Sequence, residues 1–262
     1  MNRYFKALSF NIILCISLIF ILQNNISYGQ NNDIDMLMSI KNEEEYLTTR
    51  IKDLDYILKN KKQYKILNSN INNISLVKKI SIDSIKYSQI KFFKMYMDRQ
   101  LADCKINQNL LISKIKEEKR EILQNTGGTY IKGGWPIEDY RYISSSYGYR
   151  IHPITNKISF HSGIDIPAPK NTSVLASDDG IVIFAGYKNG YGNVVEIEHF
   201  DNKKTLYAHN ESIVVSKGSI VKKGQVIAKV GSTGNSTGNH IHFEVKVNNE
   251  RINPLSGINN NI

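Results

Sequence analysis

The stretch STGNHIHFEVKV, residues 236–247, decides the fold of the C-terminal half of this 262-residue chain. Apolar and polar residues alternate in it, and a strand has a period of two, so the stretch is predicted to be a β-strand with one buried face. The same period puts His240 and His242 on one side of that strand. The pattern therefore predicts a strand that presents two imidazoles to a common site.

A second cluster of chemical side chains lies in FHSGIDIPAP, residues 160–169, where Asp165 follows His161 by four positions. This spacing fits one turn of a helix, but Gly163 and the two nearby prolines disfavour a helix here. We therefore expect a loop that runs into a short strand and directs both side chains to one point.

Two imidazoles and one carboxylate form a known catalytic zinc set, because three protein ligands leave one tetrahedral position for water. A bound metal lowers the pKa of that water, which becomes a nucleophile near neutral pH. Proton transfer and oxyanion stabilisation remain, and His209 and the histidine of the His-x-His pair that does not bind the metal are suited to both tasks. Single histidines in strands are usually structural, but most of the six histidines cluster between residues 161 and 242.

These residues lie in segments that resemble the lysostaphin-type zinc metallopeptidases, which cleave bacterial cell-wall peptides. The resemblance covers about residues 135–254 and rests on SSYGYRIHPITNKISFHSGIDIPAP (145–169), VLASDDGIVIFAGYKNGYGNVVEIEH (174–199), TLYAHN (205–210) and VKKGQVIAKVGSTGNSTGNHIHFEV (221–245). It implies one zinc ion, Zn²⁺, bound by His161, Asp165 and His242. It also implies that His209 and His240 are the catalytic histidines, which activate water and stabilise the tetrahedral intermediate.

Three further residues are candidates for substrate binding. Arg150 and His152 stand close before His161, and bracing of the fold or surface packing is the equal alternative for them. Tyr191 either lines the cleft, where an aromatic ring can stack on sugar or peptide, or is a turn aromatic. His199 ends an alternating strand and is expected to be structural. The stretch GSTGNSTG, residues 231–238, lacks the lysine of a P-loop and is expected to form a turn beside the metal.

Residues 31–126 contain neither glycine nor proline, although the chain has 17 glycines and five prolines. Apolar residues recur there with a spacing of four and three, which predicts helices. The apolar stripe comprises Leu47, Ile51, Leu54 and Leu58, then Leu67, Ile71 and Ile74, and more loosely Ile82, Ile85, Phe92, Met95, Leu111 and Ile115. We expect helices that fold back as a coiled-coil hairpin, with a break in the Asn-rich residues 67–73.

The chain is therefore predicted to be an α+β multidomain protein. An N-terminal helical coiled-coil hairpin, residues 30–126, precedes a Gly-rich linker, residues 127–135, and an all-β, antiparallel zinc metallopeptidase domain, residues 136–256. A helix rises 1.5 Å per residue, so the hairpin would reach on the order of 70 Å. It would serve as a spacer, as a docking arm for a protein partner or as an autoinhibitory segment.

Residues 1–29 have the layout of a secretory signal peptide, in which Arg3 and Lys6 precede an apolar run from Ala7 to Leu22 and a cut follows Gly29. The run is shorter than the roughly twenty residues of a comfortable membrane span, and a retained N-terminal anchor is the alternative. We expect a secreted or cell-wall-associated, extracytoplasmic protein, which meets a membrane only if this segment is retained.

The net charge and the cysteine content limit which classes of partner, disulfide and metal ligand can be expected. The formal net charge of +10 is spread along the chain without a dense basic block. It favours attraction to an anionic wall polymer, so no nucleic-acid partner is expected. Of the two cysteines, only Cys104 would remain after signal cleavage, so neither an intrachain disulfide nor a cysteine zinc ligand is expected.

The sequence thus predicts a secreted zinc endopeptidase that hydrolyses peptide bonds of peptidoglycan. The alternative is a non-hydrolytic module of the same fold that binds the wall or activates another hydrolase. A biotinyl- or lipoyl-like carrier is suggested by VKKGQVIAKVG, residues 221–231, but no hairpin tip with a modifiable lysine is evident. An iron(II) oxygenase would also use two histidines and a carboxylate, but usually with His-x-Asp spacing.

Overall fold

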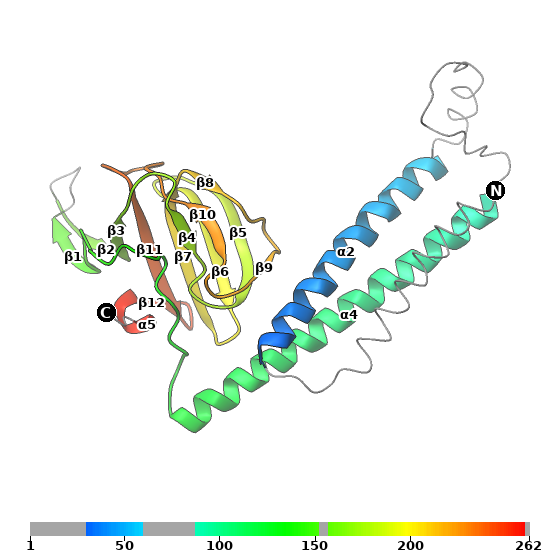
Figure 1. The fold of residues 1–262 in the computed structure, drawn as a ribbon, viewed down its shortest axis with the longest axis horizontal. Helices are drawn as coiled ribbons and strands as arrows, with labels where there is room; N and C mark the ends of the chain where they lie inside the picture. Colours follow the sequence, from blue (N-terminus) through cyan, green and yellow to red (C-terminus); the bar gives the residue numbers. More distant parts are fainter. Residues whose placement is uncertain (1–29, 60–86, 152–156, 260–262) are drawn as a thin grey trace, which may run out of the picture.

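The computed structural model describes residues 30–59, 87–151 and 157–259, which form a helical hairpin and a β-sheet domain (Figure 1). The predicted signal peptide or anchor, the predicted break at residues 67–73 and His152 lie outside the described residues. None of the described helices has the length and hydropathy that a membrane crossing requires. The helices are α2 (Gln30–Lys59), α4 (Tyr87–Thr126) and the short α5 (Pro254–Gly257).

Helices α2 and α4 pack side by side and run antiparallel (Figure 1). Near the start of α2, Asp33 accepts from Lys114 at 2.8 Å, whereas near its end Asp55 lies 3.6 Å from Lys94. The partner number in α4 falls as the number in α2 rises, which is the register of an antiparallel pair. The predicted helical hairpin is therefore confirmed.

The packing face of α2 follows the predicted stripe, because Leu47 and Ile51 are buried. The prediction for α4 is partly wrong: Leu111 and Ile115 are buried, but Phe92 and Met95 are 64% and 60% exposed. The reason is the helical period. Most residues of α4 in the apolar cluster shared with α2 are spaced by three, four or seven, and Phe92 and Met95 fall outside that row. The row comprises Met97, Leu101, Cys104, Leu111 and Ile115.

The β domain is antiparallel throughout its strand pairs, as predicted, and its largest sheet has seven strands. The order is β12-β11-β7-β6-β5-β9, and β3 also pairs with β11. The strands of this sheet are β3 (Ile164–Pro167), β5 (Gly180–Lys188), β6 (Gly192–His199), β7 (Lys203–Asn210), β9 (Ile220–Val221), β11 (His240–Val247) and β12 (Glu250–Ile252).

Two smaller sheets complete the domain. One has the order β4-β10-β8, and the other is the hairpin β1-β2. Their strands are β1 (Gly148–Ile151), β2 (Ile158–His161), β4 (Ser173–Leu175), β8 (Ser212–Ile213) and β10 (Val226–Lys229).

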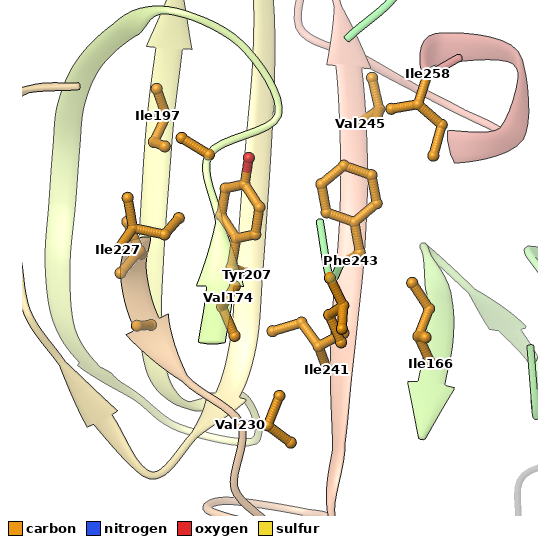
Figure 2. Packing of buried hydrophobic residues seen from close by; sticks show 14 of the residues in the cluster. Ile166, Val174, Ile197, Tyr207, Ile227, Val230, Ile241, Phe243, Val245 and Ile258 are labelled. Atoms are coloured by element: carbon orange, nitrogen blue, oxygen red, sulfur yellow. The ribbon is translucent and has the colours of Figure 1, made fainter. Parts of the chain in front are cut away.

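The hydrophobic core lies between the seven-stranded sheet and the sheet that contains β4 and β10 (Figure 2). From β11, the alternate residues Ile241, Phe243 and Val245 point into it, and each is fully buried. Val174 of β4 and Ile227 of β10 meet them from the other side. Because β11 alternates strictly, its other face is left for the polar residues of the predicted site.

The helical hairpin docks on the β9 edge of the large sheet, which is the opposite edge from β3 and β12. Phe200 and Ile220 of the sheet domain are buried against the helices. Two ion pairs flank this apolar contact: Lys119 of α4 with Asp178 at 3.4 Å, and Lys222 with Asp35 of α2. The hairpin therefore lies away from the strands that carry the predicted metal ligands.

Candidate metal centre and catalytic site

The pairing of β3 with β11 creates the centre of the site. Its register places Asp165 directly opposite His242. Gly163 sits between the two predicted ligands of the first segment, and a Cβ at this position would lie 2.9 Å from His242 Cε1 and collide with the backbone oxygen of Phe243. Only glycine therefore allows the chain to approach β11 this closely between His161 and Asp165.

The structure brings the three predicted metal ligands together in a buried group. The three donor atoms form a triangle. His242 Nδ1 lies 2.9 Å from Asp165 Oδ1 and 3.1 Å from His161 Nε2, and His161 Nε2 lies 3.2 Å from Asp165 Oδ1. Ligand atoms about 2.0–2.1 Å from a tetrahedral zinc are separated by about 3.3 Å from one another. The triangle of donor atoms thus has the size of one face of a zinc tetrahedron.

The other nitrogen of each ligand histidine has its own partner. His161 Nδ1 lies 2.9 Å from the backbone oxygen of Ser146, and His242 Nε2 lies 3.3 Å from Oε1 of Glu244. Each of these nitrogens is placed to donate its proton, so His161 Nε2 and His242 Nδ1 keep their lone pairs for a cation. Metal-binding histidines are oriented in this way by a carbonyl or a carboxylate behind the ring. The donor set and its outer partners therefore fit a divalent metal such as zinc.

The two predicted catalytic histidines lie beside this triangle. The rings of His209 and His240 are 4.8 Å apart, and the ring of His209 is 5.8 Å from that of His242. In each, Nδ1 lies 2.8 Å from a backbone oxygen, of Thr233 for His209 and of Gly238 for His240. Their Nε2 atoms are thereby left for chemistry, and that of His240 lies 3.7 Å from Asp165 Oδ1.

The backbone of His209 has a φ of 61°, in the left-handed region that favours glycine. Its amide nitrogen donates to the backbone oxygen of Tyr191 at 2.8 Å, which holds this conformation. A non-glycine residue in this region costs of order 1 kcal/mol or more, and such residues are concentrated at functional sites. The strained position agrees with a role for His209 beyond packing.

Burial and charge set the protonation of the site. Burial raises the pKa of Asp165, but the hydrogen bonds that His161 and His242 donate to it when their rings carry both protons outweigh burial and hold that pKa well below its usual range. Burial is also the main cause that lowers the pKa of His209, to about 4. His209 is therefore neutral at pH 7, with Nε2 able to accept a proton.

The structure places two of the three substrate-binding candidates at the site. Arg150 of β1 directs Nη2 to Asp165 Oδ2 at 3.7 Å. Tyr191 directs its hydroxyl to Glu244 at 2.7 Å, and its ring centre is 5.7 Å from that of His242. Both side chains thus contact residues of the metal group, and their predicted contact with substrate stays a prediction.

His199 is buried away from the metal group and is hydrogen-bonded on both nitrogens. Its Nδ1 lies 2.9 Å from the backbone oxygen of Asp179, and Nε2 lies 2.8 Å from Thr205 Oγ1. Burial, reinforced by the charge of Lys203, lowers the pKa of His199 to about 4. This neutral, fully partnered ring matches the structural role expected for it.

Sequence reasoning did not single out Glu244, although the structure places it directly behind His242. It has no exposed surface, and desolvation is outweighed by hydrogen bonds from His242, Ser162 and Tyr191, which lower its pKa to about 2. One signal was available: Glu244 follows His242 by two positions, so both lie on the polar face of a strand that is otherwise apolar.

Comparisons with known proteins point to one family. A sequence profile of peptidase family M23 matches residues 159–254. The DD-carboxypeptidase/endopeptidase Mpg of Neisseria meningitidis is 49% identical over 127 residues, which are 48% of this chain and 29% of that protein. The peptidoglycan DD-endopeptidase ShyA of Vibrio cholerae is 33% identical over 178 residues, 62% of this chain and 41% of that protein.

Solved structures with similar sequences were also found. A zinc-containing peptidase from Vibrio cholerae is 38% identical, with 48% of this chain and 40% of that chain covered and a TM-score of 0.45. The catalytic domain of lysostaphin from Staphylococcus simulans is 31% identical, with 45% and 91% covered and a TM-score of 0.41. The chain spans less than half the length of the two curated relatives, Mpg and ShyA.

Proposed function

Because the chain belongs to peptidase family M23, we propose that it is a zinc-dependent endopeptidase that hydrolyses peptide bonds of bacterial peptidoglycan. The observation that carries this proposal is the triangle of donor atoms from His161, Asp165 and His242, with sides of 2.9, 3.1 and 3.2 Å. The names of the relatives Mpg and ShyA support the wall peptide as substrate.

Zinc bound to these three residues would supply Lewis acidity, which polarises a carbonyl group and lowers the pKa of water. The chain itself supplies the proton transfers. Nε2 of His209 accepts the proton of the attacking water, since the lowered pKa of this ring keeps it neutral at pH 7. Nε2 of His240, on the neighbouring ring, donates a hydrogen bond to the oxyanion that develops on the scissile carbonyl when that ring carries a second proton, because its Nδ1 proton is directed at the backbone oxygen of Gly238.

Backbone contacts hold both histidines in the required orientation. The carbonyl groups of Thr233 and Gly238 fix the Nδ1 atoms, so that neither ring can turn without losing a hydrogen bond. Proton transfer by a positioned side chain contributes about a hundredfold to ten-thousandfold in rate. The two rings thus have the geometry for the transfer steps of amide hydrolysis.

We also propose an extracytoplasmic location, in which the protein is secreted or bound to the wall. This proposal is supported by the signal-peptide layout of residues 1–29 and by the position of peptidoglycan outside the cytoplasmic membrane. A protein partner for the helical hairpin stays a prediction. The exposed apolar residues of α4, Phe92, Met95, Ile106 and Leu110, support it.

The test of the function is the release of new amino termini from purified peptidoglycan by the full chain, with and without a chelator. The wild type is expected to release them only when metal is present. His161→Ala is expected to lose both zinc binding and hydrolysis. His209→Ala is expected to keep zinc binding and to lose hydrolysis by at least a hundredfold.

The pair of variants distinguishes catalysis from a binding role. If zinc-loaded wild type binds peptidoglycan but releases no amino termini from any cross-bridge type, the non-hydrolytic module is the correct reading. If His209→Ala remains as active as the wild type, the catalytic assignment of that residue is wrong. Mass spectrometry of the released fragments identifies the bond that is cleaved.

A further inference from the structure

Glu244 is a buried carboxylate that the proposed reaction does not itself use. It lies on β11, two residues after His242 and on the same face, with no exposed surface. We propose that Glu244 is a positioning residue, which fixes the proton of His242 on Nε2 so that Nδ1 is free for the metal. This inference rests on the proposed metal-dependent function, and it assigns Ser162, Tyr191 and Arg251 the task of holding Glu244.

The ring of His242 lies between two carboxylates. Its Nδ1 is 2.9 Å from Asp165 Oδ1, and its Nε2 is 3.3 Å from Glu244 Oε1. A neutral imidazole has one N–H, so only one of these contacts is a hydrogen bond donated by the ring. If the proton were on Nδ1, the ring would donate to Asp165 and the lone pair would point away from the metal group. Glu244 stabilises the other tautomer.

The tautomer matters because the donor triangle needs the Nδ1 lone pair. His161 presents Nε2 to the same point, 3.1 Å from His242 Nδ1. His161 takes its tautomer from a backbone oxygen, that of Ser146. His242 has Glu244 in the equivalent place, so a side chain rather than the backbone decides whether the second imidazole can bind. Mutation of such an outer partner typically lowers metal affinity by about tenfold to a hundredfold.

Glu244 is held by three other donors. Ser162 Oγ and Tyr191 OH donate to Oε1 at 2.5 Å and 2.7 Å, and Arg251 Nε donates to Oε2 at 3.1 Å. The guanidinium of Arg251 balances the charge of the buried carboxylate, which would otherwise be costly. Ser162 follows His161 in the chain, so Glu244 connects the segment of the first ligand to the strand of the second.

This arrangement gives Tyr191 a defined contact. Its hydroxyl is directed at Glu244, and its ring packs near the ring of His242. Removal of the hydroxyl leaves Glu244 with Ser162 and Arg251, so the effect on zinc binding is expected to be smaller than that of changing Glu244 itself. Zinc affinity is therefore expected to decrease from the wild type to Tyr191→Phe and further to Glu244→Gln.

The test measures zinc affinity of the full chain by competition with a chromophoric chelator, which requires no substrate. Glu244→Gln is expected to bind zinc about tenfold to a hundredfold more weakly than the wild type. Tyr191→Phe is expected to fall between the two. Glu198→Gln, which removes a carboxylate paired with Lys204 on the surface of β6, is the matched control and is expected to bind zinc as the wild type does.

A spectroscopic readout separates positioning from a purely structural role. In zinc-free protein at alkaline pH, nitrogen-15 NMR is expected to show the proton of His242 on Nε2 in the wild type and a shift of population toward Nδ1 in Glu244→Gln. A residue that only stabilised the fold would lower the melting temperature without changing the tautomer. Wild-type zinc affinity in Glu244→Gln, or an unchanged tautomer, overturns the proposal.

A failure of this inference can be distinguished from a failure of the proposed function. If the wild type binds zinc but cleaves no peptidoglycan, the proposed function fails while the comparison of zinc affinities still stands. If the wild type binds no zinc, both fail. If Glu244→Gln does not fold, Tyr191→Phe carries the test, and wild-type zinc affinity in that variant refutes the role of Glu244.

Discussion

Nζ of Lys119, on α4, lies 3.4 Å from Oδ1 of Asp178 in the sheet domain, and both side chains are almost fully buried. The other oxygen of Asp178 accepts from Lys203 at 2.9 Å, and Lys203 has no exposed surface. One carboxylate thus neutralises a lysine of the helical hairpin and a lysine of the sheet. A buried charge that loses its partner is strongly destabilising, so this contact couples the two parts of the molecule.

Asp178→Asn is expected to change the acid stability of the protein. Burial alone would raise the pKa of Asp178, but the charges of Lys203 and Lys119 lower it from 3.8 to about 2. Because the folded-state pKa is lowered, the contribution is complete above pH 4 and is lost as the pH falls toward 2. Its size is about 2 kcal/mol. Urea unfolding between pH 2 and 7 measures it.

The control for Asp178→Asn is Asp53→Asn, which removes an exposed carboxylate of α2. The control is expected to keep the wild-type dependence of stability on pH, whereas Asp178→Asn flattens it between pH 4 and 2. Equal slopes for wild type and Asp178→Asn in this window would show that the buried cluster does not stabilise the charged form of Asp178.

His199→Gln is expected to change how stability depends on pH, in a pH range above that of Asp178. Burial lowers the pKa of His199 from 6.5 to about 4, so the unfolded chain takes up a proton before the folded protein does. The wild type therefore loses stability as the pH falls from about 6.5 to 4, by about 3 kcal/mol. The variant lacks this loss but keeps the one caused by His209, whose pKa is also lowered to about 4, and it is less stable at pH 7. Chemical unfolding at pH 7, 5.5 and 4 decides; a decline as steep in the variant as in the wild type contradicts the assignment.

Gly163→Ala is expected to weaken both the fold and the metal site. The added methyl group would lie 2.9 Å from His242 Cε1 and against the backbone of Phe243, so β3 must move away from β11. Overpacking of this kind costs about 1–3 kcal/mol. Gly186→Ala is the matched control, because its Cβ would make only ordinary contacts of 3.5 Å or more. Thermal unfolding and zinc affinity that are equal in the two variants would contradict this account.

Zinc is expected to stabilise the folded chain. A ligand that binds only the folded state adds about 2.7 kcal/mol at a concentration one hundred times its Kd. Thermal unfolding of chelator-treated protein, with and without added zinc, gives the shift in Tm. His242→Ala removes one corner of the donor triangle and is expected to abolish most of the shift. A shift of wild-type size in this variant would place the metal elsewhere.

Patterns that act over short distances could be predicted from the sequence. The absence of glycine and proline in residues 31–126 predicts the helices, and the alternation in residues 236–247 predicts that Ile241 and Phe243 face the core while His240 and His242 face the other way. Both follow from the period of a single element. The same local reasoning brought Asp165 and His161 into one loop.

Contacts between distant segments could not be predicted in this way. The role of Glu244 depends on Ser162, Tyr191 and Arg251, which come from three other segments and meet only when the sheet forms. The exposure of Phe92 could not be predicted, because α4 carries apolar residues on more than one side. Only the position of α2 decides which side is buried.

The antiparallel course of α2 and α4 determines where the upstream chain joins the protein. Asp35, in the second turn of α2, pairs with Lys222 of the sheet domain, so α2 begins beside that domain and leads away from it. Helix α4 then returns over a length of about 60 Å. The start of α2 and the end of α4 therefore lie at the same end of the hairpin, next to the sheet domain, so the hairpin does not act as a spacer between residue 30 and the histidine centre.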